Sequence, residues 1–192
     1  MNRKEKRLIE LHKEIQKCKK CVLADTRTNA VPGEGPVNAK IMIIGQAPGA
    51  LEDKTGRPFV GRAGKFLDKL LEIAQIDRKK VFITSPIKCF PPKNRKPKAS
   101  ELKACLPYLK KQIEIISPEK FILLGDVAFS VFFPKLKLKD YRGRVIKLNK
   151  KEFFITYHPA AGLRFPQMKE ILIKDFKKLK KLGWCKKQTR DF

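Results

Sequence analysis

The chain has 192 residues, of which 42% are hydrophobic, which is enough for one domain over residues 1–192 with a substantial core. No apolar run reaches transmembrane length, so we expect a soluble protein with no membrane partner. The 45 Lys and Arg residues against 19 Asp and Glu residues give a formal net charge of +26, which predicts an extended polyanion as partner. The alternative is a thermophile's lysine-rich surface, but that would carry matching acidic residues. Anionic membrane is disfavoured because the basic residues are spread along the chain.

Apolar residues recur along the chain at helical and strand spacing. Leu8, Leu11 and Ile15 predict a first helix, and a turn-rich segment follows at 32–36. Strands are predicted at 40–45, 81–84 and 121–125, and helices at 66–74, from a Ser100 cap to Ile116, and after the third strand. Segments 145–148 and 152–157 predict a hairpin or one bent final strand, and a last helix runs from Pro166 to a stop at Gly183. This alternation indicates an α/β fold with a parallel sheet covered by helices on both faces.

Four cysteines suggest one metal centre. Cys18 and Cys21 form a C-x-x-C motif, and Cys89 and Cys105 lie far along the chain. Segment 1–11 is charged and lacks the apolar core of a signal peptide, so we expect the reducing cytoplasm and not a disulfide framework. Four thiolates suit a [4Fe–4S] cluster or a structural zinc, and four unrelated buried thiols are the alternative. Cys185, at the end of the last predicted helix, has no partner at ligand spacing and is interpreted as a packed or free thiol.

In a parallel sheet, ligands bind beyond the carboxyl ends of the strands, so the segments that follow the strands are the candidates for a site. The first strand is followed by a tight GQAPG loop at 45–49, which matches neither a P-loop nor a dinucleotide fingerprint. The second is followed by a rigid cationic segment at 88–95, which could support phosphates, and the last by His158. His12, within a lysine-rich helix, is interpreted as solvated.

The chain resembles the family 4 uracil-DNA glycosylases over nearly its whole length. The matching pieces are Cys18-x-x-Cys21, RTNAVPGEG at 27–35, GQAPG at 45–49, GRPFVGRAG at 56–64, Lys88-Cys89 with Pro91-Pro92 and Asn94-Arg95, Cys105, and Tyr157-His158-Pro159. The resemblance implies a three-layer α/β/α fold with a central four-stranded parallel sheet, and a structural [4Fe–4S] cluster on the four cysteines, with structural zinc as the minor alternative. It also implies cleavage of uracil from deaminated DNA in base excision repair.

The resemblance also assigns expected roles to individual residues. Phe59 would stack on the extruded base, and His158 would donate a hydrogen bond toward uracil O2 as charge develops there. Gly45, Gln46 and Ala47 would form the pocket wall and help to position the attacking water, with Glu52, backed by Asp53, as the nearest carboxylate. Leu163 and Arg164 would enter the DNA groove, and Lys93 and Arg95 would be presented to DNA. We expect a monomer, with a sliding clamp as a candidate partner.

Two positions depart from the family pattern. Family members usually carry glutamate at the position of Gln46 and asparagine at that of Ser85. Glutamine cannot accept a proton at neutral pH, so a general base is absent there. One hydroxyl satisfies only part of the uracil edge that an asparagine amide can pair with. Two alternatives to uracil excision therefore stay open, namely a glycosylase for another deaminated base such as hypoxanthine and a non-hydrolytic iron–sulfur DNA-binding protein.

Overall fold

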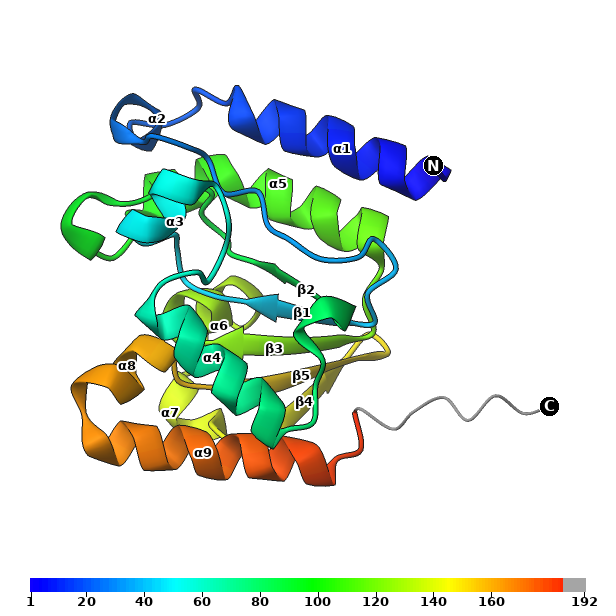
Figure 1. The fold of residues 1–192 in the computed structure, drawn as a ribbon, viewed down its shortest axis with the longest axis vertical. Helices are drawn as coiled ribbons and strands as arrows, with labels where there is room; N and C mark the ends of the chain where they lie inside the picture. The colour runs from blue at the N-terminus through cyan, green and yellow to red at the C-terminus, as the bar shows by residue number, and fades with distance from the viewer. Residues whose placement is uncertain (185–192) are drawn as a thin grey trace.

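The computed structural model describes residues 1–184 and shows three layers around one five-stranded sheet (Figure 1). The strands are β1 (Ile41–Ile44), β2 (Val81–Thr84), β3 (Lys120–Leu124), β4 (Val145–Leu148) and β5 (Lys151–Thr156), in the order β2-β1-β3-β5-β4. The longer helices are α1 (Arg3–Gln16), α4 (Arg62–Ile73), α5 (Ala99–Ile116) and α9 (Pro166–Lys181). The shorter ones are α2 (Leu23–Thr26), α3 (Ala50–Thr55), α6 (Asp126–Phe132), α7 (Leu138–Tyr141) and α8 (Pro159–Arg164), with 3-10 turns η1 (Arg78–Lys80) and η2 (Pro92–Asn94).

The sheet buries both of its faces, as the continuous apolar strands predicted. Alternate residues of the strands pack with α1, α5 and α6 on one face and with α4 and α9 on the other. This confirms the α/β class with helices on both sides of the sheet. Among residues 1–184, no helix is long and apolar enough to cross a membrane.

The sheet has one strand more than the four parallel strands that we expected. β2, β1, β3 and β5 are parallel, and β4 pairs antiparallel with β5. Asn149 and Lys150 both have positive φ, at 50° and 61°, and form the two-residue turn that joins the hairpin. The hairpin alternative is therefore the one that this chain adopts.

Two local predictions are wrong. α5 begins after Lys98 and not at a Ser100 cap, because the Glu101 carboxylate accepts the Lys98 backbone N–H at 2.7 Å. His12 is half-buried and not solvated, and its Nε2 is buried without a hydrogen-bond partner. Burial, followed by the nearby Lys88 charge, lowers the pKa of His12 to about 4. The expectation for Cys185 lies outside the described residues.

Candidate active site and metal centre

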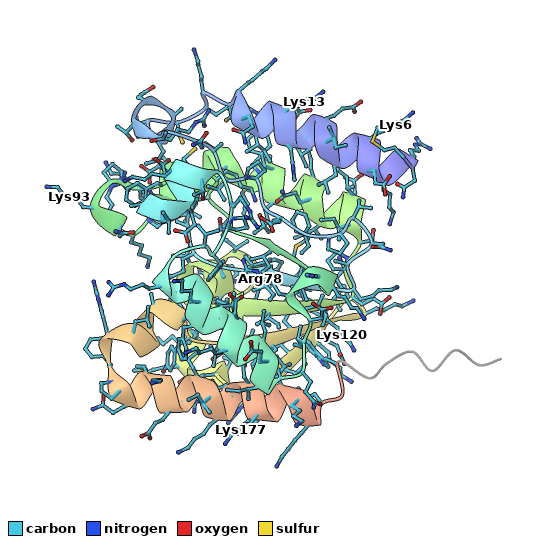
Figure 2. The ribbon with its side chains drawn as sticks, in the orientation of Figure 1. Lys6, Lys13, Arg78, Lys93, Lys120 and Lys177 are labelled. Atoms are coloured by element: carbon cyan, nitrogen blue, oxygen red, sulfur yellow. The ribbon has the colours of Figure 1, made fainter. Side chains whose placement is uncertain are left out.

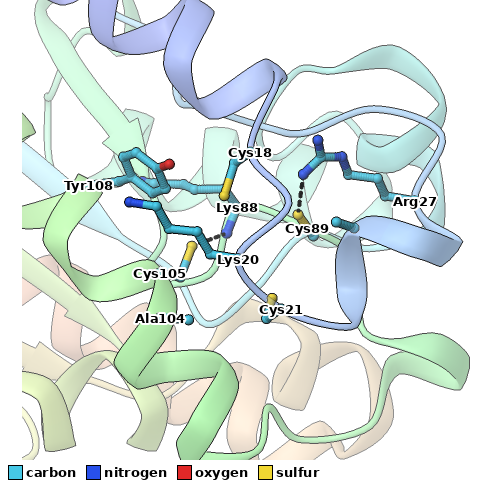
Figure 3. A pocket seen from close by; sticks show the side chains of 10 residues that line it. Cys18, Lys20, Cys21, Arg27, Lys88, Cys89, Ala104, Cys105 and Tyr108 are labelled. Carbon is cyan, nitrogen blue, oxygen red and sulfur yellow. Dashed lines mark hydrogen bonds between the residues drawn. The ribbon is translucent and has the colours of Figure 1, made fainter.

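The four predicted cysteines line one cavity (Figure 3). Cys18 and Cys21 follow α1, Cys89 follows β2, and Cys105 lies in α5, so the cavity joins three distant segments. All four thiols are free, and Cys89 and Cys105 are buried. Within residues 1–184, no group of three His, Cys, Asp or Glu side chains is arranged to hold a single metal ion. In a cubane cluster each thiolate instead binds a separate iron atom, so the four cysteines fit a cluster by number and type.

Cations surround the cysteine cavity. Arg27 Nη1 donates to Cys89 Sγ over 3.1 Å, and the backbone N–H of Lys88 donates to Cys105 Sγ over 3.3 Å. Burial raises the pKa of the Cys89 thiol, and the Arg27 guanidinium opposes the rise. Burial raises the pKa of Cys105 to about 11, and the Lys88 charge opposes it. Both thiols would have to lose their protons to bind a metal, and the cations favour that loss.

Phe59 and His158 meet at the carboxyl ends of the strands. Their ring centroids are 5.5 Å apart, with planes inclined by 30°. Gly45, directly after β1, lies beneath them, because a Cβ there would stand 2.7 Å from the Phe59 ring and 3.8 Å from His158 Nε2. Only glycine therefore allows the two rings to approach the backbone at this point. The side chains of Gln46 and His158 both approach Gly125, which follows β3, because a Cβ there would stand 3.0 Å from Gln46 Cδ and 3.1 Å from His158 Cβ.

The surroundings of His158 determine which of its ring nitrogens carries the proton and whether the ring is charged. His158 caps the N-terminus of α8, where its Nδ1 accepts the Ala160 backbone N–H at 3.2 Å. In the neutral ring, the proton must then be on Nε2, the nitrogen that faces Gly45. Burial lowers the pKa of His158 to about 4, so the ring is neutral at physiological pH. It presents one N–H donor beside Gly45.

Phe59 is held in a costly backbone conformation. Its φ is +52°, in the left-handed region that non-glycine residues rarely adopt. Arg78 Nη2 donates to the carbonyls of Pro58 and Phe59 at 3.0 and 3.2 Å, and Asp68 holds the same guanidinium at 2.6 Å. Gly64 leaves room for this loop, since a Cβ there would stand 1.8 Å from the Phe59 carbonyl oxygen. Strain maintained by several contacts at one aromatic ring is typical of a ligand-binding position.

Glu52 joins the two loops beside the pocket. One carboxylate oxygen accepts the backbone N–H groups of Val60 and Gly61, both at 2.9 Å, and the other accepts that of Gly49 at 3.2 Å. Asp53 behind it accepts the Thr28 N–H. Three N–H donors hold the Glu52 carboxylate in place, so this residue keeps the GQAPG loop against the Phe59 loop.

Ser85 directly follows β2 and lies beside Gly45, because Ile44 pairs with Thr84 in the parallel register. The Ser85 hydroxyl is buried and donates to the Ile87 carbonyl oxygen at 2.5 Å. Its single proton is therefore engaged within the protein. Only its oxygen lone pairs remain for a ligand.

Basic and apolar side chains project from the same edge of the sheet. Lys93, in η2, is exposed and points away from the body of the protein, whereas Lys177 lies on the outer side of α9 (Figure 2). Arg95 is half-buried and forms an ion pair with buried Glu101. Leu163 and Phe165 expose 48% and 54% of their surfaces, on either side of exposed Arg164. This rim has the mixture of cations and apolar side chains that contacts bases and phosphates.

The sequence prediction missed the supporting residues. Arg27 and Lys88 were recognised only as parts of motifs, and Arg78 and Gln112 not at all. Lys88 Nζ donates to Gln112 Oε1, and Arg78 clamps the Phe59 loop. The one signal in the sequence for such a network was a lysine in the middle of the otherwise apolar segment 86–90.

The fold and this edge define an α/β domain with a cysteine-lined centre and two stacked rings at the carboxyl ends of its strands, and comparison with known proteins agrees. The family model of the uracil DNA glycosylase superfamily matches residues 32–182. The type-4 uracil-DNA glycosylase of Sulfurisphaera tokodaii is 46% identical, with 96% of this chain and 89% of that protein covered. Those of Saccharolobus solfataricus and Thermotoga maritima are 46% and 42% identical, covering 93% and 86% of this chain and 87% and 89% of theirs.

The chain therefore belongs to the uracil DNA glycosylase superfamily, and within it to the type-4 enzymes.

Proposed function

We propose that this protein hydrolyses the N-glycosidic bond of uracil in DNA and so initiates base excision repair. The observation that carries the proposal is the stack of Phe59 and His158 over Gly45, where a neutral Nε2–H donor faces a flat aromatic site. The names of the relatives, which are uracil-DNA glycosylases, support it.

The proposed reaction starts with extrusion of the nucleotide, because a base within the duplex cannot reach such a pocket. Extrusion costs on the order of a few kcal/mol in lost stacking and pairing. Contacts of the rim with phosphates and neighbouring bases offset this cost, and stacking on Phe59 holds the extruded base. The exposed Leu163 fills the space that the base leaves.

Bond cleavage then creates a positive charge on the sugar and a negative charge on the departing uracil. His158 stabilises the negative charge, since its Nε2–H is preorganised as a donor by the Nδ1 bond to Ala160. Gln46 orients the attacking water through its amide but takes no proton from it. The water oxygen bonds to C1′ as the C1′–N1 bond breaks, and the proton that the water loses goes to the released uracil anion or to solvent. Glu52 contributes a fixed negative charge near the cationic sugar and keeps the two loops in place. Stabilisation of the leaving group thus carries more of the catalysis than base activation of water does.

We propose that Cys18, Cys21, Cys89 and Cys105 hold a [4Fe–4S] cluster. Bound there, the cluster would supply a rigid cross-link between the segment after α1, the segment after β2 and α5. The nearby Arg27 and Lys88 support this proposal, because a cluster with four thiolates carries net negative charge in a buried place. The cross-link would also fix the loop that presents Lys93 to DNA, which Arg95 ties to buried Glu101.

The test is incubation of the purified protein with a uracil-containing oligonucleotide, followed by alkali. We expect strand breakage at the uracil position, a loss of at least about 100-fold in rate for His158→Ala, and no change for Lys177→Ala on the outer side of α9. Salt-sensitive DNA binding without any release of free base from single or double strands would instead indicate a non-hydrolytic DNA-binding protein.

A second candidate activity is excision of hypoxanthine, and the hydrogen bond of Ser85 favours it. Because this hydroxyl donates to Ile87, it can only accept from a ligand. Uracil N3–H and hypoxanthine N1–H are donors, whereas the matching ring nitrogens of cytosine and adenine are acceptors. With a single acceptor, the Ser85 oxygen, the site can therefore distinguish deaminated bases from their parent bases but cannot distinguish uracil from hypoxanthine.

Oligonucleotides that carry uracil, hypoxanthine, cytosine or adenine at one position test this second activity. We expect release of both deaminated bases and of neither parent base, and Ser85→Asn should speed both releases, since the amide can accept from the ring N–H and also donate to uracil O4 or hypoxanthine O6. Release of uracil alone by both proteins would eliminate the hypoxanthine activity and leave the primary proposal intact.

A further inference from the structure

Lys88 is a buried lysine without a role in the bond cleavage above, and burial lowers the pKa of its ammonium group to about 7. Only 1% of its surface is exposed. Its Nζ donates to Thr84 Oγ1 at 2.5 Å, to Gln112 Oε1 at 2.6 Å and to the Ser85 carbonyl oxygen at 2.8 Å. Three oxygen acceptors match the three N–H donors of an ammonium group, so the buried charge is fully hydrogen-bonded.

The acceptors around Lys88 are themselves fixed. Gln112 Nε2 donates to the Pro32 carbonyl oxygen at 2.7 Å, and Thr84 Oγ1 donates to the same oxygen at 2.9 Å. The segment containing Pro32 is held to β2, because Glu34 and Ile83 exchange backbone hydrogen bonds at 2.7 and 2.9 Å. The Lys88 ammonium thus lies at the centre of a network that joins α5, the end of β2 and the 32–34 segment.

The backbone of Lys88 reaches the metal centre. Its N–H donates to Cys105 Sγ, and the next residue is Cys89 (Figure 3). Its carbonyl oxygen accepts the Val31 N–H at 2.7 Å. Through its side chain, the same residue holds the carbonyl of Ser85, the first residue of the turn beside Gly45. Lys88 is therefore in direct contact both with the cysteine cavity and with the turn that faces the base pocket.

We propose that Lys88 is a positioning residue that fixes the Ser85–Ile87 turn against the metal centre and so sets the edge of the pocket that reads the base. The inference rests on the proposed glycosylase function, because reading a base is the task of this turn. An apolar residue at position 88 would remove the donor that Thr84 Oγ1, Gln112 Oε1 and the Ser85 carbonyl oxygen share, and the turn would be tied to the cluster only through the backbone.

The holoprotein variants Lys88→Met and Lys88→Met with Gln112→Leu test this proposal. Methionine keeps the volume of the side chain and removes its three donors, and Gln112→Leu removes one of the acceptors left unpaired. The matched control is Leu179→Ala in α9, where a buried residue on the opposite face of the sheet is truncated. Iron content and visible absorbance show in each variant whether the cluster is retained.

We expect both Lys88 variants to keep the cluster. Their single-turnover rate of uracil release, per active site, should fall at least tenfold, with a change below threefold in the dissociation constant for DNA. Hydrogen exchange at the Val31 amide should become at least tenfold faster, while the Gly125 amide, which donates to Thr156, stays protected. Leu179→Ala should lower the unfolding temperature and leave the rate per active site unchanged.

The proposal is overturned if the Lys88 variants retain the wild-type rate per active site, or if they slow only in proportion to a loss of stability matched by Leu179→Ala. If neither Lys88 variant folds, Thr84→Val tests the proposal instead, because it removes one of the three acceptors while Lys88 stays in place. Uracil release by Thr84→Val that is at least threefold slower, with the cluster retained, would support the inference. An unchanged rate would overturn it. Wild-type protein that releases no uracil would contradict the proposed function instead.

Discussion

The imidazole of His158 and the ring of Phe59 stack with centroids 5.5 Å apart, although one follows β5 and the other lies between α3 and α4. Phe59 is only half-buried, and its backbone is held in place by Arg78. The ring is therefore positioned beside His158 and packs only in part against the core.

Replacement of this aromatic ring should affect catalysis more than stability. We expect Phe59→Ala to slow single-turnover uracil release at least tenfold, about the effect of losing one base–aromatic stack of 1–3 kcal/mol. The unfolding temperature should change little. Rates measured at saturating enzyme, beside a thermal melt, check this result, and a wild-type rate would show that the base does not stack there.

The contribution of His158 to the rate of base release should be nearly independent of pH above about 5. His158 acts as a neutral donor, and burial lowers its pKa to about 4, so the neutral form predominates throughout this range. Protonation near pH 4 would break the bond between Nδ1 and the Ala160 N–H and reduce activity. A pH series of single-turnover rates measures this directly. A rate that falls as pH rises through about 6.5, the ordinary pKa of histidine, would mean that the imidazolium is required.

His12 should make the protein less stable in mild acid. Its pKa is lowered to about 4 in the folded state, so between pH 4 and 6.5 the unfolded chain binds more protons. The free energy of unfolding that depends on His12 is therefore greatest above pH 6.5 and decreases as the pH falls toward 4. His12→Leu should raise stability at neutral pH by about 1 kcal/mol, because it removes an unpaired buried nitrogen. It should also flatten the acid dependence, and denaturant titrations at several pH values would reveal either effect.

Loss of one cysteine ligand should remove the cluster. We expect Cys105→Ser to give colourless protein without iron and a lower unfolding temperature, because three segments lose their common cross-link. Cys185→Ser is the control for a general effect of removing a thiol and should keep colour and iron. Visible spectra with an iron assay distinguish the variants, and full iron content in Cys105→Ser would exclude this residue as a ligand.

Phe165 should contribute to DNA binding. This ring exposes 54% of its surface, while its backbone is fixed between α8 and α9, where its N–H donates to the Ala161 carbonyl and its own carbonyl accepts from Met168 and Lys169. We expect Phe165→Ala to weaken DNA binding about 5- to 100-fold and Phe165→Trp to preserve it. Leu182→Ala, at an exposed apolar position after α9, is the control. Equal affinities for all four proteins, measured by fluorescence anisotropy, would exclude Phe165 from the interface.

Much of the fold followed from local pattern. The apolar run at 40–45 and the helical spacing at 66–74 predicted β1 and α4, because the spacing of buried side chains along a strand or helix can be read from neighbouring residues. The additional strand β4 was left undecided, since a hairpin and a bent strand have the same pattern until the left-handed turn at Asn149 and Lys150 forms. His12 was misjudged because its lysine neighbours lie on the solvated face of α1, whereas its own ring turns toward Phe82.

The sequence by itself determined the α/β class, the four cysteines, the glycine loop and the histidine after the last strand, because each is defined by residue type and spacing. The tertiary structure alone decided which partners these groups have. Arg27 on Cys89, Arg78 on the Phe59 carbonyl and Gln112 on Lys88 are contacts between distant segments, and the order of strands in the sheet brings them together. Hydrogen bonds of this kind depend on direction and burial, which the spacing of residues along a chain does not encode.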